Sequence, residues 1–342
     1  MEYRFYTGSY AKTQEESIAR YRVDFEAKTF VKELSCCSLD WPSYVLTHPN
    51  GKILYACREL TAEGAVHAME ISGDSLIHRG TWETKGNDPC NLCLDDEGKF
   101  LFVANYSGGN VSVFALDAEG IPTAMTEDRR HVGSGPRLDR QASAHPHCVY
   151  YRAGILYVCD LGCDSVYRYA LDKTSGTLTE RGRIALPAGA GARHMVFHPQ
   201  RPELLYVMGE LSSTIYLFRL EGEEAELIQA VPALPEDFTG DSIAAAIKFS
   251  EDGKFLFTSN RGHDSICVCR VGDDGRLTVV QQHPCLGEHP RDFTVFGNYI
   301  LVANQKSDRI DCLRFDPLGG CLEPWPMVLE TIAPTHILKR ED

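Results

Sequence analysis

Residues 88–117, DPCNLCLDDEGKFLFVANYSGGNVSVFALD, decide the fold. Residues 96–99 and 107–110 read as hairpin turns, in which glycine supplies the positive φ that a tight turn requires. Between and after these turns, FLFVANY and VSVFAL are rich in aromatic and β-branched residues, as strands are. The stretch therefore predicts a unit in which a short strand, a stronger strand and a third strand follow one another through tight turns.

This unit recurs along the chain. Its second strand reappears as ILYACREL from residue 53, ILYVCDLG from 155, LLYVMGEL from 204, FLFTSNRG from 255 and YILVANQK from 299. The steps between corresponding residues are 47, 55, 49, 51 and 44, counted over Tyr55, Phe102, Tyr157, Tyr206, Phe257 and Leu301. Repeats of this length with three or four strands each favour a β-propeller over a β-sandwich.

The two ends of the chain complete the count. TIAPTHILKRED, residues 331–342, resembles a first strand with nothing after it, and residues 3–23 resemble a second and third strand with no first. Pairing the two ends builds a seventh blade and closes the ring, which removes exposed sheet edges. We therefore expect an all-β, seven-bladed β-propeller that forms a single domain over residues 1–342.

Composition excludes several classes of function. A net charge of −14 disfavours nucleic acid and anionic membranes as partners, since both require a basic surface. No stretch is apolar enough to span a membrane, and the start of the sequence does not read as a signal peptide, so we expect a cytoplasmic protein. The 13 cysteines are odd in number and lie mostly in strand patterns, which indicates reduced, buried thiols. Cys90 and Cys93 form a C-x-x-C pair, but no second pair stands at zinc-binding spacing.

Propeller geometry predicts where a site lies. The start of each first strand and the end of each second strand meet at one mouth of the central channel. Asn105, Asp160, Asn260 and Asn304 occupy a repeated position there, which indicates turns or bridging hydrogen bonds rather than chemistry. The charged residues that do not repeat are more informative, and they are His147, Arg193, Glu210 and Arg261.

Two readings of the glycine-rich segment before Arg193 compete. A dinucleotide-binding loop needs a helix after its glycines, whereas residues 189–193 precede a strand. We therefore interpret these glycines as a close approach of the backbone. His194 and His198 lie four residues apart on a strand and not on a helix, so we expect structural roles for them.

The remaining candidates leave alternatives open. His145 and His147 could chelate a metal, or one could act as an acid/base while the other is structural. Glu210 could cap a turn, pair with Arg193 or act as a general base. Arg193 and Arg261 could be structural ion-pair partners or a fork for a phosphate or carboxylate.

Several segments resemble the lactonase family of seven-bladed propellers, which includes propeller-type 6-phosphogluconolactonases and fungal carboxy-cis,cis-muconate lactonizing enzymes. The resemblance covers nearly the whole chain and is carried by HPHCVYY, GAGARHMVFHP, VMGEL and TSNRG, among others. It implies His147 (with His145 as the less favoured choice), Arg193, Glu210 and Arg261 as active residues. Ala192 and Gly209 depart from the family pattern, which commonly has proline and asparagine there, but neither removes a charge.

The resemblance implies hydrolysis of a small anionic sugar lactone, most of all 6-phosphogluconolactone in the pentose phosphate pathway, with no metal or organic cofactor. Glu210 or His147 would activate water, and Arg193 and Arg261 would bind the phosphate or stabilise the oxyanion. We expect a monomer or weak homo-oligomer. The alternatives are a cycloisomerase or lyase acting on a muconate-type lactone, and a propeller that binds partner proteins without catalysis.

Overall fold

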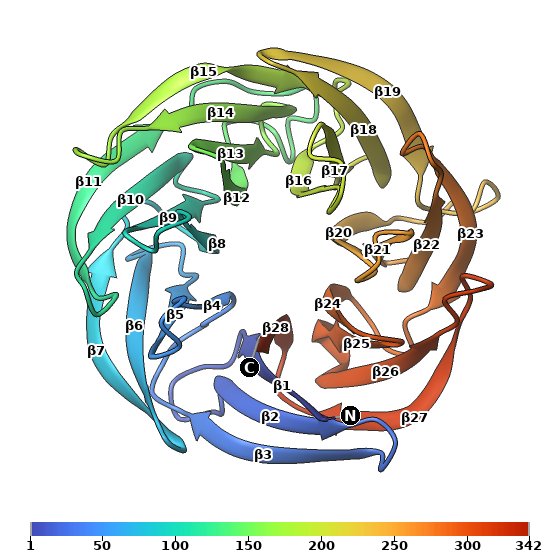
Figure 1. Ribbon diagram of the computed structural model, residues 1–342, viewed down its shortest axis with the longest axis horizontal. Coiled ribbons are helices and arrows are strands. Elements are labelled where there is room, and N and C mark those ends of the chain that lie inside the picture. Colours follow the sequence, from blue (N-terminus) through green and yellow to red (C-terminus); the bar gives the residue numbers. More distant parts are fainter. Residues whose placement is uncertain (1, 341–342) are drawn as a thin grey trace. The chain divides into compact units, whose positions relative to one another are not determined.

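The computed structural model describes residues 2–340, and within them it has seven four-stranded β-sheets and one short 3-10 helix (Figure 1). Each sheet except the one that holds both chain ends is built from four consecutive strands. The strands of the first four sheets along the chain are β1 (Glu2–Ser9), β2 (Ile18–Asp24), β3 (Thr29–Cys36), β4 (Val45–Thr47), β5 (Ile53–Arg58), β6 (Ala65–Ser72), β7 (Ser75–Glu83), β8 (Pro89–Leu94), β9 (Phe100–Asn105), β10 (Asn110–Leu116), β11 (Pro122–Arg130), β12 (Pro146–Arg152), β13 (Ile155–Asp160), β14 (Ser165–Leu171) and β15 (Leu178–Ala185). The remaining elements are β16 (Ala192–Phe197), β17 (Leu204–Gly209), β18 (Thr214–Glu221), β19 (Glu224–Pro232), β20 (Ile243–Phe249), β21 (Phe255–Arg261), β22 (Ser265–Val271), β23 (Leu277–Pro284), β24 (Pro290–Phe296), β25 (Tyr299–Asn304), the 3-10 helix η1 (Gln305–Ser307), β26 (Arg309–Phe315), β27 (Leu322–Glu330) and β28 (Pro334–Arg340).

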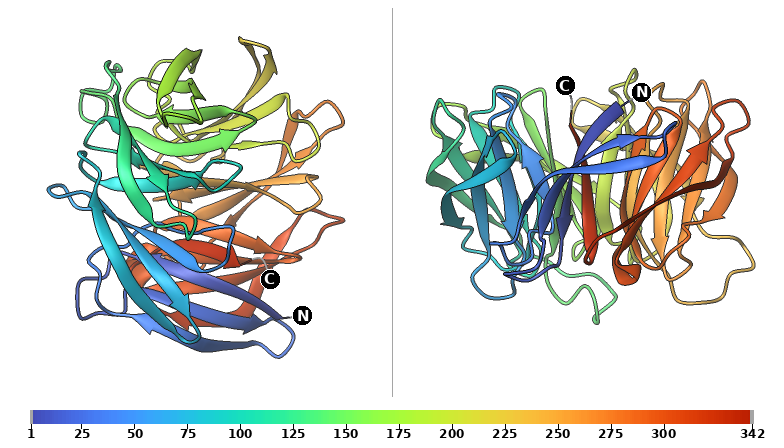
Figure 2. Two further views of the ribbon diagram at one scale, coloured as in Figure 1. Left: turned by 60° about the vertical axis from the view of Figure 1, so that its left-hand side comes forward. Right: turned by 90° about the horizontal axis from the view of Figure 1, so that it is seen from below.

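This arrangement confirms the predicted all-β, seven-bladed propeller. The sheet that holds both chain ends has the order β28-β1-β2-β3, and β28 and β1 lie side by side in both figures of the whole chain (Figures 1 and 2). The pairing of the two ends in one blade was expected from residues 3–23 and 331–342. It also gives β28 a hydrogen-bonded neighbour in β1.

The second strands of the sheets are mostly buried. Every residue of β9 and β21 is buried, because these strands are covered on both faces and carry apolar residues at consecutive positions. Fourth strands such as β7 and β11 are mostly exposed or half-buried. The sheets are therefore anchored through their second and third strands.

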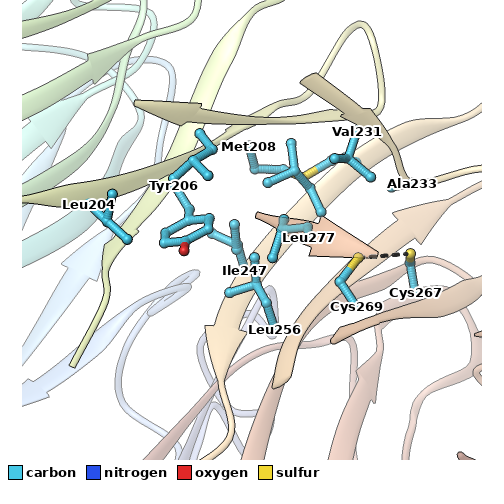
Figure 3. Close-up of a cluster of buried hydrophobic side chains, with 13 residues drawn as sticks. Leu204, Tyr206, Met208, Val231, Ala233, Ile247, Leu256, Cys267, Cys269 and Leu277 are labelled. Carbon is cyan, nitrogen blue, oxygen red and sulfur yellow. Dashed lines mark hydrogen bonds between the residues drawn. The ribbon is translucent and has the colours of Figure 1, made fainter. Parts of the chain in front are cut away.

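Contacts divide the chain into two compact units. The N-terminal unit contains Tyr6–Arg20 and Lys32–Ala192, and the C-terminal unit contains the chain up to Phe5, Tyr21–Val31 and the chain from Arg193 onward. In the C-terminal unit, a cluster of buried side chains joins the sheet β16–β19 to the sheet β20–β23 (Figure 3). Tyr206 of β17 and Ile247 of β20 lie in this cluster, and the Tyr206 hydroxyl donates to the carbonyl of Gly275 at 2.7 Å. The cluster thus fixes β17 against β20 and β21.

A repeated aspartate ties the start of a first strand to the sheet before it. Asp164, Asp264 and Asp308 each follow a second strand and adopt positive φ, between 48° and 53°. Their carboxylates accept the backbone N–H groups of Gly191 (2.6 Å), His289 (2.8 Å) and Ala333 (2.8 Å), which stand directly before β16, β24 and β28. These three first strands therefore begin at positions set by the turn of the preceding sheet.

All 13 cysteines carry free thiols, and all except Cys37 and Cys321 are buried or half-buried. Within residues 2–340, no helix has the length and apolar character needed to cross a membrane.

Candidate functional site

Arg193, Glu210 and Arg261 lie in contact in the C-terminal unit. Arg193 Nε is 2.8 Å from Glu210 Oε2 as an ion pair, and Arg261 Nη2 donates a hydrogen bond to the same oxygen at 2.8 Å. All three side chains are at least 95% buried. One carboxylate oxygen therefore holds two buried guanidinium groups.

The three residues come from three neighbouring points of the fold. Arg193 is the second residue of β16, Glu210 directly follows β17, and Arg261 is the last residue of β21. Backbone hydrogen bonds of Ala244 join Glu210 to Arg261. The N–H of Ala244 donates to the carbonyl of Glu210 at 3.0 Å, and its carbonyl accepts from Arg261 Nη2 at 2.8 Å. The cluster shown in Figure 3 packs β17 against β20 and β21, so the apolar core holds Glu210 beside Arg261.

Burial leaves positive charge poorly compensated in this group. Burial lowers the pKa of Arg261 to about 9 from an ordinary value of 12.5; Glu210 opposes this shift, and the charges of Arg193 and Arg291 add to it. Arg261 Nε is buried and has no hydrogen-bond partner among the described residues. A buried polar group of this kind is costly unless something hydrogen-bonds to it, and an anionic ligand would supply that bond.

Two histidines and a third arginine adjoin the group. Arg193 Nη1 lies 3.2 Å from His194 Nε2, and since a guanidinium only donates, this nitrogen is the unprotonated acceptor. His289 has φ of +61°, and burial together with Arg261, Lys306 and Arg291 lowers its pKa to about 4. His194 therefore contacts the site, although sequence reasoning gave it a structural role.

Arg291 was not selected as a site residue from the sequence. It lies in a β-bulge of β24, since Pro290 pairs with Asn304 and Asp292 pairs with Ala303 on the partner strand. Bulges re-aim side chains and are common beside active sites. Its position in the repeat matches that of Arg193, and this match is the signal that could have identified it.

His147, the fourth predicted residue, lies in the N-terminal unit on β12. It also occupies a bulge, because Pro146 pairs with Asp160 and Cys148 pairs with Cys159. Its ring meets the edge of Tyr106 at 5.6 Å between centroids. The imidazole is 6% exposed, and its predicted catalytic role stays a prediction.

His145 is held differently. Its Nδ1 is 2.9 Å from the carbonyl oxygen of Tyr106, so this nitrogen carries the proton, and its ring stacks on Tyr106 at 4.5 Å. Within residues 2–340, no group of three or more His, Cys, Asp or Glu side chains is arranged to hold a metal ion. The structural partner in the pair is therefore better assigned to His145.

The glycine-rich segment before Arg193 binds an anion of its own chain. The N–H groups of Gly189 and Gly191 donate to the two carboxylate oxygens of Asp164 at 2.7 and 2.6 Å, and both glycines have positive φ. These amides are consequently occupied by Asp164. The close approach of the backbone that the sequence predicted is therefore an approach to the Asp164 carboxylate.

In the C-x-x-C pair, Cys90 is buried and Cys93 is half-buried. The Cys90 thiol lies 3.5 Å from the carbonyl oxygen of His147, and burial raises the pKa of Cys93 well above the ordinary value. A thiol that stays protonated is a weak nucleophile and metal ligand. The structure thus gives these two cysteines a packing role.

Comparison with known proteins places the chain among lactonases. A family model described as "Lactonase, 7-bladed beta-propeller" matches residues 4–338. The 6-phosphogluconolactonase of Bacillus subtilis is 34% identical over 346 residues, covering 98% of both chains. A Lactobacillus plantarum protein of known structure has a TM-score of 0.92 at 30% identity, with full coverage of both chains. A periplasmic gluconolactonase of Pseudomonas aeruginosa also has a TM-score of 0.92, at 26% identity and 99% coverage of both.

Proposed function

The chain belongs to the lactonase family of seven-bladed β-propellers, and we propose that it hydrolyses a sugar lactone, with 6-phosphogluconolactone as the favoured substrate. The observation that carries this proposal is the buried Arg193–Glu210–Arg261 group, in which two guanidiniums share one carboxylate oxygen. Such a group suits a substrate that carries negative charge or develops it during reaction.

Hydrolysis of a lactone requires three things of the protein. Water attacks the ring carbonyl carbon as a base removes its proton, the carbonyl oxygen becomes an oxyanion, and the ring carbon–oxygen bond then breaks as the ring oxygen gains a proton. The products are one carboxylate and one hydroxyl. A cation near the carbonyl oxygen stabilises the intermediate, and removing one such donor typically costs about 10²–10³ in kcat.

We assign the guanidiniums to the anionic parts of the substrate. Arg261 has a buried Nε without a hydrogen-bond partner among the described residues, so it can receive a new acceptor oxygen. Arg193 forms an ion pair with Glu210, and its Nη1 is engaged by His194, a contact that Arg261 lacks among the hydrogen bonds described above. Arg261 therefore takes the phosphate, and Arg193 takes the developing oxyanion.

Glu210 and His147 remain as the two candidates for the general base. Glu210 Oε2 already receives both guanidiniums, and this pairing stabilises the ionised carboxylate, so accepting a proton there would disrupt two ion pairs. His147 has a chemistry suited to proton transfer near neutral pH. In this proposal Glu210 orients the arginines and His147 takes the proton from water.

Substrate preference tests the assignment. Rates with freshly generated 6-phosphogluconolactone and with unphosphorylated glucono-δ-lactone, each corrected for spontaneous hydrolysis, are measured for wild type, Arg261→Met and Arg193→Met. We expect Arg261→Met to lower kcat/KM for the phosphorylated lactone by about 10²-fold and to affect the neutral lactone far less. Arg193→Met should lower both. Equal losses on both substrates for Arg261→Met would contradict its assignment to the phosphate.

A further inference from the structure

A buried hydrogen-bonded chain joins the sheet that carries His147 to His131, which directly follows β11 of the preceding sheet. His131 Nδ1 is 2.7 Å from Asp160 Oδ2, and both side chains are fully buried. The hydroxyl of Tyr169 is 3.0 Å from His131 Nε2, and Tyr167 stacks on the imidazole at 3.9 Å between centroids. Because a carboxylate oxygen accepts, Nδ1 is the nitrogen that carries the proton.

The other oxygen of Asp160 holds the backbone that leads into β12. Asp160 Oδ1 accepts the N–H of His145 at 2.8 Å and the N–H of Cys163 at 3.1 Å. With His131, the carboxylate thus has three donors, as a fully buried carboxylate needs. One of the three belongs to the residue two before His147.

The equivalent residue in three other sheets is an asparagine. Asn105 and Asn304 end their second strands as Asp160 does, and Asn260 is the residue before the end of β21. The Oδ1 atom of each asparagine is buried without a hydrogen-bond partner among the described residues. Their Nδ2 groups donate to backbone carbonyls, which for Asn260 and Asn304 belong to Ala233 and Cys285. These two residues directly follow a fourth strand, as His131 does.

An asparagine therefore meets the needs of the fold at this position. In the sheet that carries His147, the polarity is reversed, since Asp160 accepts from an imidazole where the asparagines donate to a carbonyl. As a result of this reversal, Asp160 Oδ1 accepts hydrogen bonds from backbone N–H groups, whereas the Oδ1 atoms of the asparagines accept none.

The backbone entering β12 also differs from that of other first strands. Gly191 and His289 have positive φ, and their N–H groups are held by aspartates in the turn of the preceding sheet. His145 is not among the residues with positive φ, and its N–H is held by Asp160 of its own sheet. Asp160 pairs with Pro146, directly beside the bulge that contains His147.

We propose that Asp160 and His131 are positioning residues, which set the backbone path of residues 145–147 and thereby the placement of the His147 imidazole. The proposal rests on the proposed function in one respect, because it takes His147 to be the base. Asp160 and His131 are fully buried and act through the backbone of His145 rather than on the substrate.

Asp160→Asn is the first variant, because the fold uses asparagine at this place in three other sheets. A second variant combines Asp160→Asn with His131→Ala and so recreates the pairing of Asn260 with Ala233. Because the fold already contains this pairing, the double variant should fold even if Asp160→Asn alone does not. We expect both to fold and to lose about 10- to 100-fold in kcat, with KM changed by no more than about twofold, since small misplacement of a catalytic group affects turnover. His131→Asn keeps an N–H donor near the place of Nδ1 and should stay within about threefold of wild type.

The control variant is Ile53→Val, which removes one methylene group from a core cluster that joins β5 to β8 and β9 in the N-terminal unit. It lowers stability without altering residues 145–147, and we expect its kcat to match that of wild type. If Asp160→Asn retains wild-type kcat, the positioning role is wrong. It is equally wrong if kcat falls only in proportion to the fraction of folded protein, as a purely structural role would require.

A spectroscopic readout separates this proposal from the proposed function. The imidazole NMR signals of His145 and His147, assigned through single His→Gln variants, should shift in Asp160→Asn, while those of His198 and His283 stay in place. This comparison holds even for a wild type that hydrolyses no lactone, a result that would overturn the proposed function alone. Unshifted signals of His145 and His147 would overturn the positioning role.

Discussion

At the scale of single residues, the decisive feature is one carboxylate oxygen that holds two buried guanidiniums. A glutamate in such a site could act as a general base. Here the contacts of Glu210 make it the counter-charge that keeps Arg193 and Arg261 in place. Removing one partner from a buried ion pair leaves an uncompensated buried charge, which is the costly outcome. Stability and anion binding at this site are therefore linked.

Glu210→Gln tests this linkage. We expect the free energy of unfolding to fall by about 3–5 kcal/mol, because two buried guanidiniums lose their carboxylate. Added inorganic phosphate should restore part of the loss by binding the folded state. Urea unfolding with and without phosphate measures both effects. Glu323→Gln is the control: Glu323 pairs with Arg314 on the surface, where such a pair contributes at most about 1 kcal/mol. A Glu210→Gln protein as stable as this control would contradict the account.

The lowered pKa of Arg261 predicts a pH dependence of anion binding. In the free protein Arg261 is charged below about pH 9 and loses its proton as the pH rises through that value. The affinity for the product 6-phosphogluconate should therefore weaken above about pH 9, whereas an ordinary arginine stays charged. Calorimetric titration across this range measures the effect. Arg261→Met should bind weakly at every pH, and a wild-type affinity that is constant through this range would contradict the assignment.

At the scale of elements, aspartates in the turns of the preceding sheets fix where β16, β24 and β28 begin. Asp264 accepts the N–H of His289 through its side chain, and its carbonyl accepts the N–H of Cys285 at 2.8 Å. These bonds join the turn after Arg261 to the segment before Arg291. The same device at Asp164 places the start of the strand that carries Arg193.

Replacement of Asp264 should loosen this junction. Asp264→Ala removes the acceptor and places a β-carbon without a polar group at φ of +53°, so we expect a loss of about 1–3 kcal/mol. Asp264→Asn keeps an acceptor and tolerates positive φ, and it should cost less than half as much. Chemical denaturation of both variants gives the comparison. Equal stability of the two variants would show that the carboxylate does not anchor β24.

The elements that the sequence predicted are those with a strong local signal. The second strands, such as FLFVAN in β9, are buried throughout, so their hydrophobic runs stand out. Fourth strands were left uncertain at three or four per sheet, because exposed strands such as β7 and β11 carry polar residues at most positions. Their place in the sheet follows from backbone pairing, which a hydrophobic pattern does not record.

The residues of the candidate site also divide into those that the sequence predicted and those that it missed. Arg193, Glu210 and Arg261 were identified because they interrupt a repeat with charge, and the structure brings them into contact. Asn105, Asn260 and Asn304 form the bridging hydrogen bonds expected of their repeated position. Asp160 was grouped with them, and its partner His131 was missed. The two lie 29 residues apart, and only the folded backbone shows that the imidazole faces the carboxylate.

At the scale of the whole molecule, the last strand is attached by a buried polar network. Asp292 of β24 accepts the N–H of Ile337 at 3.0 Å and pairs with Lys248 of β20 at 2.8 Å. His336 of β28 lies 3.7 Å from Asp292. Burial lowers the pKa of His336 to about 4, against the opposing effect of Asp292. Closure of the chain therefore depends on a histidine that is neutral in the folded state.

Acidification should weaken the fold through this histidine. The unfolded chain binds the His336 proton below the ordinary pKa of 6.5, whereas the folded chain does so only near 4, so stability is lost as the pH falls between these values. From about pH 7 to about pH 5 the loss from this group amounts to about 2 kcal/mol. His336→Gln should remove that part of the pH dependence, as denaturation at the two pH values would show. An identical pH dependence in variant and wild type would contradict it.

The central claim is that this chain hydrolyses a sugar lactone through the Arg193–Glu210–Arg261 group. The most direct test is the initial rate on freshly generated 6-phosphogluconolactone, coupled to 6-phosphogluconate oxidation and corrected for spontaneous hydrolysis, for wild type and for a folded Arg193→Met protein. We predict a wild-type rate well above background and a loss of about 10²–10³-fold in the variant. A folded wild type with no rate above background, or a variant as fast as wild type, would contradict the claim.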